Sequence, residues 1–339
     1  MFDIKSEYYF IPWPYISKTV FTGFKKCKYY HKRVCLEGFT IESNRVMVEG
    51  TTLHYTYYKF FELVNFDMLF EMDWRANHDT IYSQVYNYFY SVMMTQLPED
   101  FDNKKMIRGV KSFCHLEENH WYSVREKYAE RGKILRYFKP GVKQLEIFMR
   151  NDDIRIFGTI DRISVEPEKT VIIDYKTGNV SQKVSSEIRE TVYSKDLPAY
   201  YVPEGNFYVL LYLLNMGYTV GKDENDKWNI YKNGKECNKI IKKMDYAFVF
   251  TGEKVNKFPS YYICRKKSSI VSIRSVLKTL PKMRACKEFP RNPNIMRCKY
   301  CQLFAKDCKD VVPFEIFGNI FRSKSPSSEG LQQLARSKN

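Results

Sequence analysis

One aspartate and a nearby aspartate–lysine pair form the strongest chemical pattern in the sequence. Residues 154–165, IRIFGTIDRISV, and residues 170–178, TVIIDYKTG, are β-branched and flank the polar loop EPEK, which predicts a β-hairpin. If Val165 pairs with Thr170, then Asp161 lies opposite Asp174, with the two Cβ atoms about 4.5–5.5 Å apart. Two carboxylates this close repel each other unless a proton or a cation lies between them.

The lysine adds a third group to the same face of the predicted hairpin. Asp174 and Lys176 are two residues apart on one strand, so their side chains share a face. Carboxylates in this arrangement suit Mg²⁺ or Mn²⁺, and a nearby lysine can orient the water that attacks a substrate. Spacing alone leaves one alternative open, which is a solvated sheet face with an ordinary Asp–Lys contact.

A cluster of cysteines near the end of the sequence has the spacing of metal ligands. Cys298, Cys301 and Cys308 offer three thiolates, and the fourth ligand could be the local Cys286 or the remote Cys27. A four-cysteine zinc site usually pairs two short Cys-x-x-Cys motifs, whereas this segment has one. The N-terminal residues lack the architecture of a cleavable signal peptide, so we expect a reducing, intracellular compartment, in which the nine cysteines form no disulfide framework.

Charge and composition favour a globular protein with a polyanionic partner. The 339 residues carry 55 Lys and Arg against 39 Asp and Glu, a formal net charge of +16. No run of about 18 apolar residues predicts a membrane span. Residues 15–34 predict a basic, aromatic helix or helix pair. Its side chains could contact a nucleic-acid backbone or stack on bases, or they could form a solvated helix face; they are Lys25, Lys26, Lys28, Tyr29, Tyr30, Lys32 and Arg33.

The two hairpin motifs resemble those of a known nuclease superfamily. GTIDRI at 158–163 and DYKTG at 174–178 resemble the PD-(D/E)XK superfamily, most closely its RecB-like branch and the CRISPR-associated iron–sulfur exonucleases. The resemblance implies an α/β fold, with a restriction-endonuclease-like mixed sheet flanked by helices. It also implies metal-dependent hydrolysis of DNA phosphodiester bonds by an exonuclease. Asp161 and Asp174 would be metal ligands together with the backbone carbonyl of Tyr175, and Lys176 would be the catalytic lysine.

The resemblance extends to three further residues around this site. His54, at the end of GTTLH, matches the histidine ligand of the family, and an imidazole ligand favours Mn²⁺ over Mg²⁺. Glu146, in VKQLEIF, is a candidate supporting residue behind the direct metal ligands. Tyr212 is a candidate match for the tyrosine of a later Gln-x-x-x-Tyr helix, but position 208 holds a tyrosine where the glutamine would stand.

The same family selects Cys27 as the fourth cysteine ligand. Its iron–sulfur members combine a lone N-terminal cysteine with three C-terminal ones, so the resemblance implies a 4Fe–4S cluster on Cys27, Cys298, Cys301 and Cys308, with zinc as the alternative. The implied substrate is DNA, single-stranded or with free ends. No phosphate-binding helicase motif is present, so unwinding would need a helicase or recombination partner.

We expect one nuclease domain over residues 1–315, with a helical insertion at about 60–140 and a flexible polar tail at 316–339. The other predicted elements are helices at 50–97, 120–137, 207–216 and 268–287, and strands at 245–251 and 261–265. A catalytically inactive or zinc-stapled nucleic-acid-binding module is the alternative function.

Overall fold

A computed structural model gives the structure of the chain. It describes residues 15–39, 45–71, 73–96, 103–177, 201–252 and 261–292, together with 254–255, 258–259, 298, 301, 303 and 307–308. The predicted tail at 316–339 lies outside these residues. The chain divides into two compact units: a sheet unit of Tyr15–Lys18 and Glu42–Leu280, and a terminal unit that contains Thr19–Ile41 and the chain from Pro281 onward. The predicted domain boundary at residue 315 stays a prediction.

A six-stranded mixed sheet forms the centre of the sheet unit. Its strand order is β1-β3-β4-β8-β11, and β2 pairs with β3. Strand β1 pairs with β3 in parallel, and β4 pairs with β8 in parallel. The other neighbouring strands of this sheet pair antiparallel. The strands are β1 (Ile16–Ser17), β2 (Leu145–Asn151), β3 (Ile156–Val165), β4 (Thr170–Lys176), β8 (Met244–Phe250) and β11 (Tyr262–Lys267).

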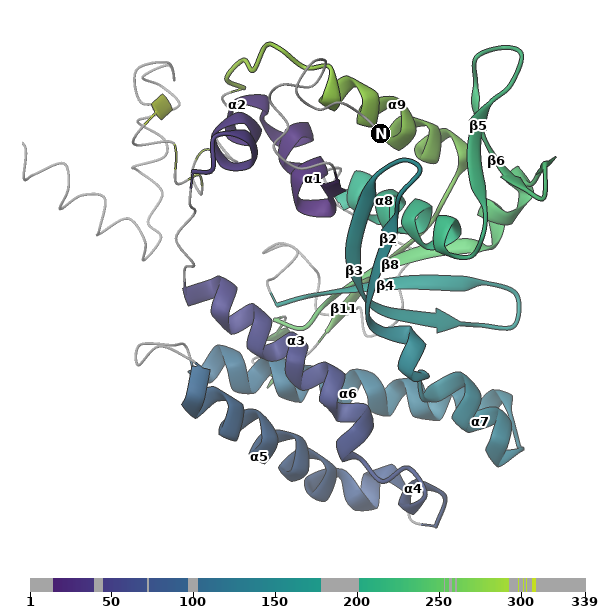
Figure 1. Cartoon of the computed structure of the whole chain (residues 1–339). Coiled ribbons are helices and arrows are strands. Elements are labelled where there is room, and N and C mark those ends of the chain that lie inside the picture. Colours follow the sequence, from purple (N-terminus) through teal and green to yellow (C-terminus); the bar gives the residue numbers. More distant parts are fainter. Residues whose placement is uncertain are drawn as a thin grey trace, which may run out of the picture. The chain divides into compact units, whose positions relative to one another are not determined.

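Helices flank both faces of this sheet, which confirms the predicted fold class. Figure 1 shows α3, α5 and α6 on one side and α8 on the other. An aromatic core fills the space between the first group and the sheet, and its largest buried side chains include Phe60, Trp74, Phe113, Trp121 and Phe138. The helices are α3 (Arg45–Leu63), α4 (Met68–Glu71), α5 (His78–Gln96), α6 (Asn103–Lys127), α7 (Arg131–Phe138), α8 (Tyr201–Asn215) and α9 (Ile270–Arg284).

The hairpin β3–β4 confirms the predicted strands and their register. Val165 pairs with Thr170, and the antiparallel pairing continues to Arg162 and Ile173. The strand β2 was not predicted, although it pairs with β3 over most of its length. Its more buried and exposed positions alternate, but one of the exposed positions holds the apolar Phe148, so the sequence lacks the matching alternation of apolar and polar residues.

Helix α8 begins six residues before the predicted start at 207. Proline and glycine usually mark a break before a helix, but Pro203 and Gly205 lie inside α8. A proline is tolerated in the first turn because its missing N–H needs no partner there. Gly205 lets the helix approach the sheet, because a Cβ at this position would lie 2.2 Å from the ring of Tyr246. The earlier start brings Glu204 into the first turn.

Within the terminal unit, the first helices contact the segment after α9. These helices are α1 (Lys18–Lys26), which belongs to the terminal unit from Thr19 onward, and α2 (Lys28–His31). A π-helical turn over Lys32–Leu36 follows them. Arg33 donates to Asp307 at 2.7 Å, and the guanidinium of Arg291 lies over the ring of Tyr29. His31 is buried beside Phe24 and Phe289.

Smaller strands complete the described structure. The strands β5, β6 and β7 form a separate three-stranded sheet, and β9 pairs with β10; their bounds are β5 (Thr219–Lys222), β6 (Trp228–Lys232), β7 (Lys235–Glu236), β9 (Lys254–Val255) and β10 (Phe258–Pro259). None of the helices in the described part of the chain is long and apolar enough to cross a membrane.

Candidate active site

The strands β3 and β4 separate at the position of the two aspartates. Counted from the hairpin turn, their last pair is Arg162 with Ile173, so the pairing stops just before it would join Asp161 to Asp174. The carboxylate of Asp161 accepts a hydrogen bond of 2.7 Å from the backbone N–H of Tyr175, which β3 no longer pairs. Asp161 therefore sits at a fork in the sheet, close to the backbone of the strand that carries Asp174.

Asp174 and Lys176 share one face of β4, as predicted. The Nζ atom of Lys176 lies 2.5 Å from Oδ2 of Asp174. This face is directed toward α8, since Lys176 also lies 2.9 Å from Glu204 of that helix. Burial raises the pKa of Asp174 to about 6, with a further contribution from Asp161, while Lys176 opposes the shift.

His54 approaches the fork from α3. Its Nδ1 atom lies 3.3 Å from Oδ2 of Asp161. Burial disfavours the charged imidazole, but the charge and hydrogen bond of Asp161 outweigh it and raise the pKa of His54. Helix α3 packs closely against α6 next to His54. A Cβ on Gly109 of α6 would lie 2.9 Å from the side chain of Leu53, so this glycine permits the close packing of the two helices.

Glu146 completes a group of three potential metal ligands. Among the described residues, His54, Glu146 and Asp161 each offer a ligand atom, and these atoms lie within 4.8 Å of one another. Glu146 has a positive φ of 45°, a conformation that costs energy in a non-glycine residue and that clusters at functional sites. Burial, followed by the charge of Asp161, raises the pKa of Glu146 to about 7.

This donor set fits a divalent cation. Two carboxylates and one imidazole suit Mn²⁺ or Mg²⁺, and a cation would offset both the burial and the charge of Asp161 that raise the pKa of Glu146. The geometry differs from the sequence expectation in one respect. Glu146, expected behind the ligands, belongs to this group, whereas the Asp174 carboxylate is directed to Lys176.

Two site residues escaped the sequence analysis, namely Glu204 and Lys18. Glu204 is 5% exposed, and its Oε1 atom lies 2.7 Å from Lys18 and 2.9 Å from Lys176. Burial alone would raise the pKa of Glu204, but the charges of the two lysines outweigh it and lower the pKa. The pattern that could have found Glu204 is Glu204-x-x-x-Tyr208, which has the spacing of the Gln-x-x-x-Tyr motif, whereas no comparable pattern marks Lys18.

Tyr208, rather than Tyr212, lies beside these charges. The Nζ atom of Lys18 lies 5.5 Å from the centre of the Tyr208 ring. Tyr212 instead hydrogen-bonds Thr170, at the opposite end of β4 from Asp174. Sequence reasoning chose Tyr212 because it placed the start of α8 too late, so that Glu204 seemed to precede the helix.

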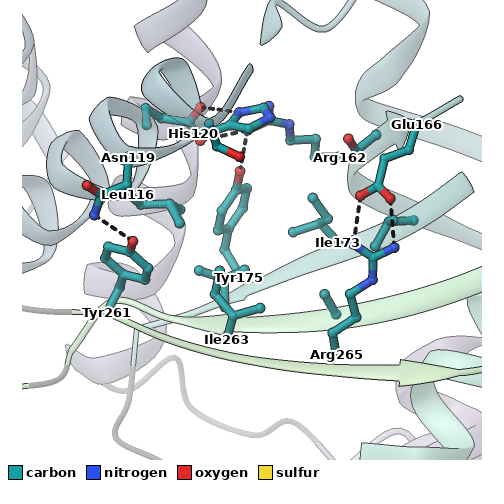
Figure 2. Close-up of a pocket in the computed structure, with 16 residues that line it drawn as sticks. Leu116, Asn119, His120, Arg162, Glu166, Ile173, Tyr175, Tyr261, Ile263 and Arg265 are labelled. Carbon is teal, nitrogen blue, oxygen red and sulfur yellow. Dashed lines mark hydrogen bonds and ion pairs between the residues drawn. The ribbon is translucent and has the colours of Figure 1, made fainter. Parts of the chain in front are cut away.

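A cavity of about 200 Å³ lies on the other face of the sheet (Figure 2). Arg162 and Tyr175 line it, and each is the sequence neighbour of a residue at the fork. Arg162 donates to Glu117 at 2.6 Å and to the Tyr175 hydroxyl at 3.3 Å. Arg162 and Glu117 are both buried, so this pair fixes β3 and β4 from behind.

The four predicted cluster ligands all lie in the terminal unit. Burial raises the pKa of Cys308 to about 11, and the nearby thiols of Cys301, Cys27 and Cys298 add to this effect. Cys286 donates from its Sγ atom to the Glu288 carbonyl at 3.0 Å. The structure thus brings Cys27 near the three C-terminal cysteines.

The basic residues of the first helices differ in their environment. Lys25 and Lys26 are exposed, whereas Lys28, Tyr29 and Tyr30 are half-buried. Lys32 and Arg33 both form ion pairs with Glu37. These ion pairs reduce the charge that the two residues can offer to a phosphate backbone.

A mixed sheet flanked by helices, with paired carboxylates and a lysine where two strands separate, is the arrangement of the restriction-endonuclease-like fold class. The model of the PD-(D/E)XK nuclease superfamily matches residues 15–305. The chain belongs to this superfamily, whose members typically hydrolyse phosphodiester bonds with divalent metals such as Mg²⁺ or Mn²⁺. No curated protein and no solved structure matches the chain significantly.

Proposed function

We propose that this protein is a metal-dependent DNA exonuclease that acts on single strands or free ends. The observation that supports this most directly is the convergence of Asp161, Asp174 and Lys176 at one fork of the sheet. The formal charge of +16 is consistent with a polyanionic substrate. The exonuclease activity and the choice of DNA rest on the resemblance to the RecB-like branch.

The metal would be held by His54, Asp161, Asp174 and the Tyr175 carbonyl, and the position of Glu146 supports adding it to this set. When bound, Mn²⁺ or Mg²⁺ supplies Lewis-acid stabilisation of the charge that develops on the scissile phosphate. Lys176 would orient the attacking water and stabilise negative charge. Burial would lower the pKa of Lys176, but Asp174 and Glu204 outweigh it and keep the ammonium protonated.

We further propose a 4Fe–4S cluster on Cys27, Cys298, Cys301 and Cys308, as in the CRISPR-associated iron–sulfur exonucleases. The effect of the nearby Cys301, Cys27 and Cys298 on the pKa of Cys308 indicates that the four thiols lie close together, which supports the proposal. The cluster would join the first helices to the C-terminal segment within the terminal unit. Free thiols persist in a reducing compartment, so we place the protein inside the cell, where a helicase or recombination partner would supply its substrate.

The test is a cleavage assay on a panel of nucleic acids. End-labelled single- and double-stranded DNA and RNA are incubated with Mn²⁺ or Mg²⁺, and the products are resolved by length. We expect stepwise shortening of DNA from an end, and no cleavage by Asp161→Asn or in the presence of EDTA. Tight binding without cleavage under all conditions would favour the inactive binding module instead.

A further inference from the structure

Lys18 places a second ammonium group beside the candidate active site. It is the last residue of the N-terminal segment that belongs to the sheet unit, directly after β1. Its Nζ atom lies 2.7 Å from Oε1 of Glu204 and 3.9 Å from Oδ1 of Asp174. Lys18 therefore contacts the same two carboxylates that contact Lys176.

The two ammonium groups converge on one atom. Lys18 and Lys176 both lie within 2.9 Å of Oε1 of Glu204. Two ammonium groups that contact the same oxygen repel each other. The negative charges of Glu204 and Asp174 offset this repulsion. Such a pair of cations can also contact two oxygens of a single anion, as a phosphate group offers.

The side chain of Lys18 is more accessible to a ligand than the carboxylates that it contacts. The side chains of Asp174 and Glu204 are both 7% exposed, whereas that of Lys18 is 24% exposed, so it is the more accessible member of each ion pair. Removing charges from water is costly, and a well-packed apolar group would stabilise the fold at least as well. The ring of Tyr208 lies beneath the ammonium and limits the directions in which it can point.

We propose that Lys18 is a second catalytic lysine, which contacts a non-bridging oxygen of the scissile phosphate while Lys176 orients the attacking water. The proposal rests on the proposed nuclease function. Negative charge on the non-bridging oxygens is stabilised by an ammonium group already fixed in position, which avoids reorganisation during the reaction. Lys18 stays protonated and transfers no proton. Glu204 is a positioning residue that holds both lysines.

The test compares Lys18→Met with Lys278→Met, an exposed lysine of α9 outside the site. Single-turnover cleavage of a single-stranded oligonucleotide is measured with Mn²⁺, and Mn²⁺ affinity is measured by calorimetry. We expect Lys18→Met to lower the cleavage rate roughly 100-fold, with Mn²⁺ affinity within about twofold of the native protein. Lys18→Arg should recover part of the loss, and Lys278→Met should match the native rate.

Oligonucleotide binding in Ca²⁺ separates this proposal from the nuclease assignment. If the native protein cleaves none of the substrates, the proposed nuclease function is contradicted. If Lys18→Met cleaves at the native rate, only the proposed role of Lys18 is contradicted. If the native protein binds but does not cleave, unchanged binding by Lys18→Met overturns the phosphate contact. If Lys18→Met unfolds, the double variant with Glu204→Gln removes the negative charge that Lys18 balances, and it is compared with Glu204→Gln alone.

Discussion

The pKa values of the two aspartates at the fork shift in opposite directions because their neighbours differ. Burial would raise the pKa of Asp161, but His54 and the N–H of Tyr175 outweigh it and lower the pKa. For Asp174, burial raises the pKa to about 6, because the opposing charge of Lys176 does not reverse the shift and Asp161 adds to it. A metal ion can therefore bind to a preformed carboxylate at Asp161, while Asp174 responds to the charges around it.

A second prediction for a single residue is that Glu146 is a metal ligand. We expect Glu146→Gln to lower Mn²⁺ affinity by about 10- to 100-fold, because one anionic oxygen is lost from a group of three donors. Calorimetric titration of the purified protein measures this. Glu168→Gln, in the exposed turn between β3 and β4, is the matched control. An affinity for Mn²⁺ equal to that of the control would return Glu146 to a supporting role.

Elements were predictable where the polarity pattern was strong. The hairpin β3–β4 followed from alternating β-branched residues and a short polar loop, and its register placed Asp161 and Asp174 together. The first turn of α8 was not predictable in this way, because Pro203 and Gly205 usually mark a break. Their tolerance depends on the first-turn position and on Tyr246, which is distant in sequence.

The packing of α8 against β8 gives a prediction for its glycine. Gly205→Ala should destabilise the protein by about 1–3 kcal/mol, because the new methyl would overlap the buried ring of Tyr246. Gly132→Ala, in α7, is the control, since no atom lies within 4 Å of its Cβ position. That variant should be neutral or slightly more stable. Urea unfolding measures both, and equal stability of the two variants would contradict the packing argument.

The buried pair behind the fork gives a second prediction for the strands. Arg162→Met should lower the free energy of unfolding by about 3–5 kcal/mol, because the buried Glu117 would lose its closest partner and keep His120 at 3.5 Å. Arg162→Met combined with Glu117→Gln should be less harmful than Arg162→Met alone. Denaturant unfolding of the two variants checks this, and a double variant as unstable as the single one would argue against a charge effect.

At the scale of the whole molecule, contacts between distant segments were the least predictable. Lys18 and Glu204 are 186 residues apart, and no local pattern in either segment indicates the other. The association of Cys27 with the C-terminal cysteines was anticipated only through the family resemblance. Composition could not supply it, because the sequence also offered Cys286 as the fourth thiol.

The cysteine arrangement predicts how the terminal unit depends on its ligands. Cys27→Ser should lose iron and become more sensitive to protease at both α1–α2 and the C-terminal segment, because metal binding is coupled to folding. Cys286→Ser should keep its iron. Iron and sulfide analysis after anaerobic purification, with limited proteolysis, tests this. The opposite pattern would make the fourth ligand local, and zinc without sulfide would replace the cluster by a zinc site.

The most direct test of the central claim is cleavage of an end-labelled single-stranded DNA by the native protein, Asp174→Ala and Lys176→Ala under identical conditions with Mn²⁺. The native protein should shorten the strand, while both variants should be inactive yet retain the native melting temperature within a few degrees. A folded Asp174→Ala or Lys176→Ala that cleaves at a rate near that of the native protein would contradict the assignment of the active site.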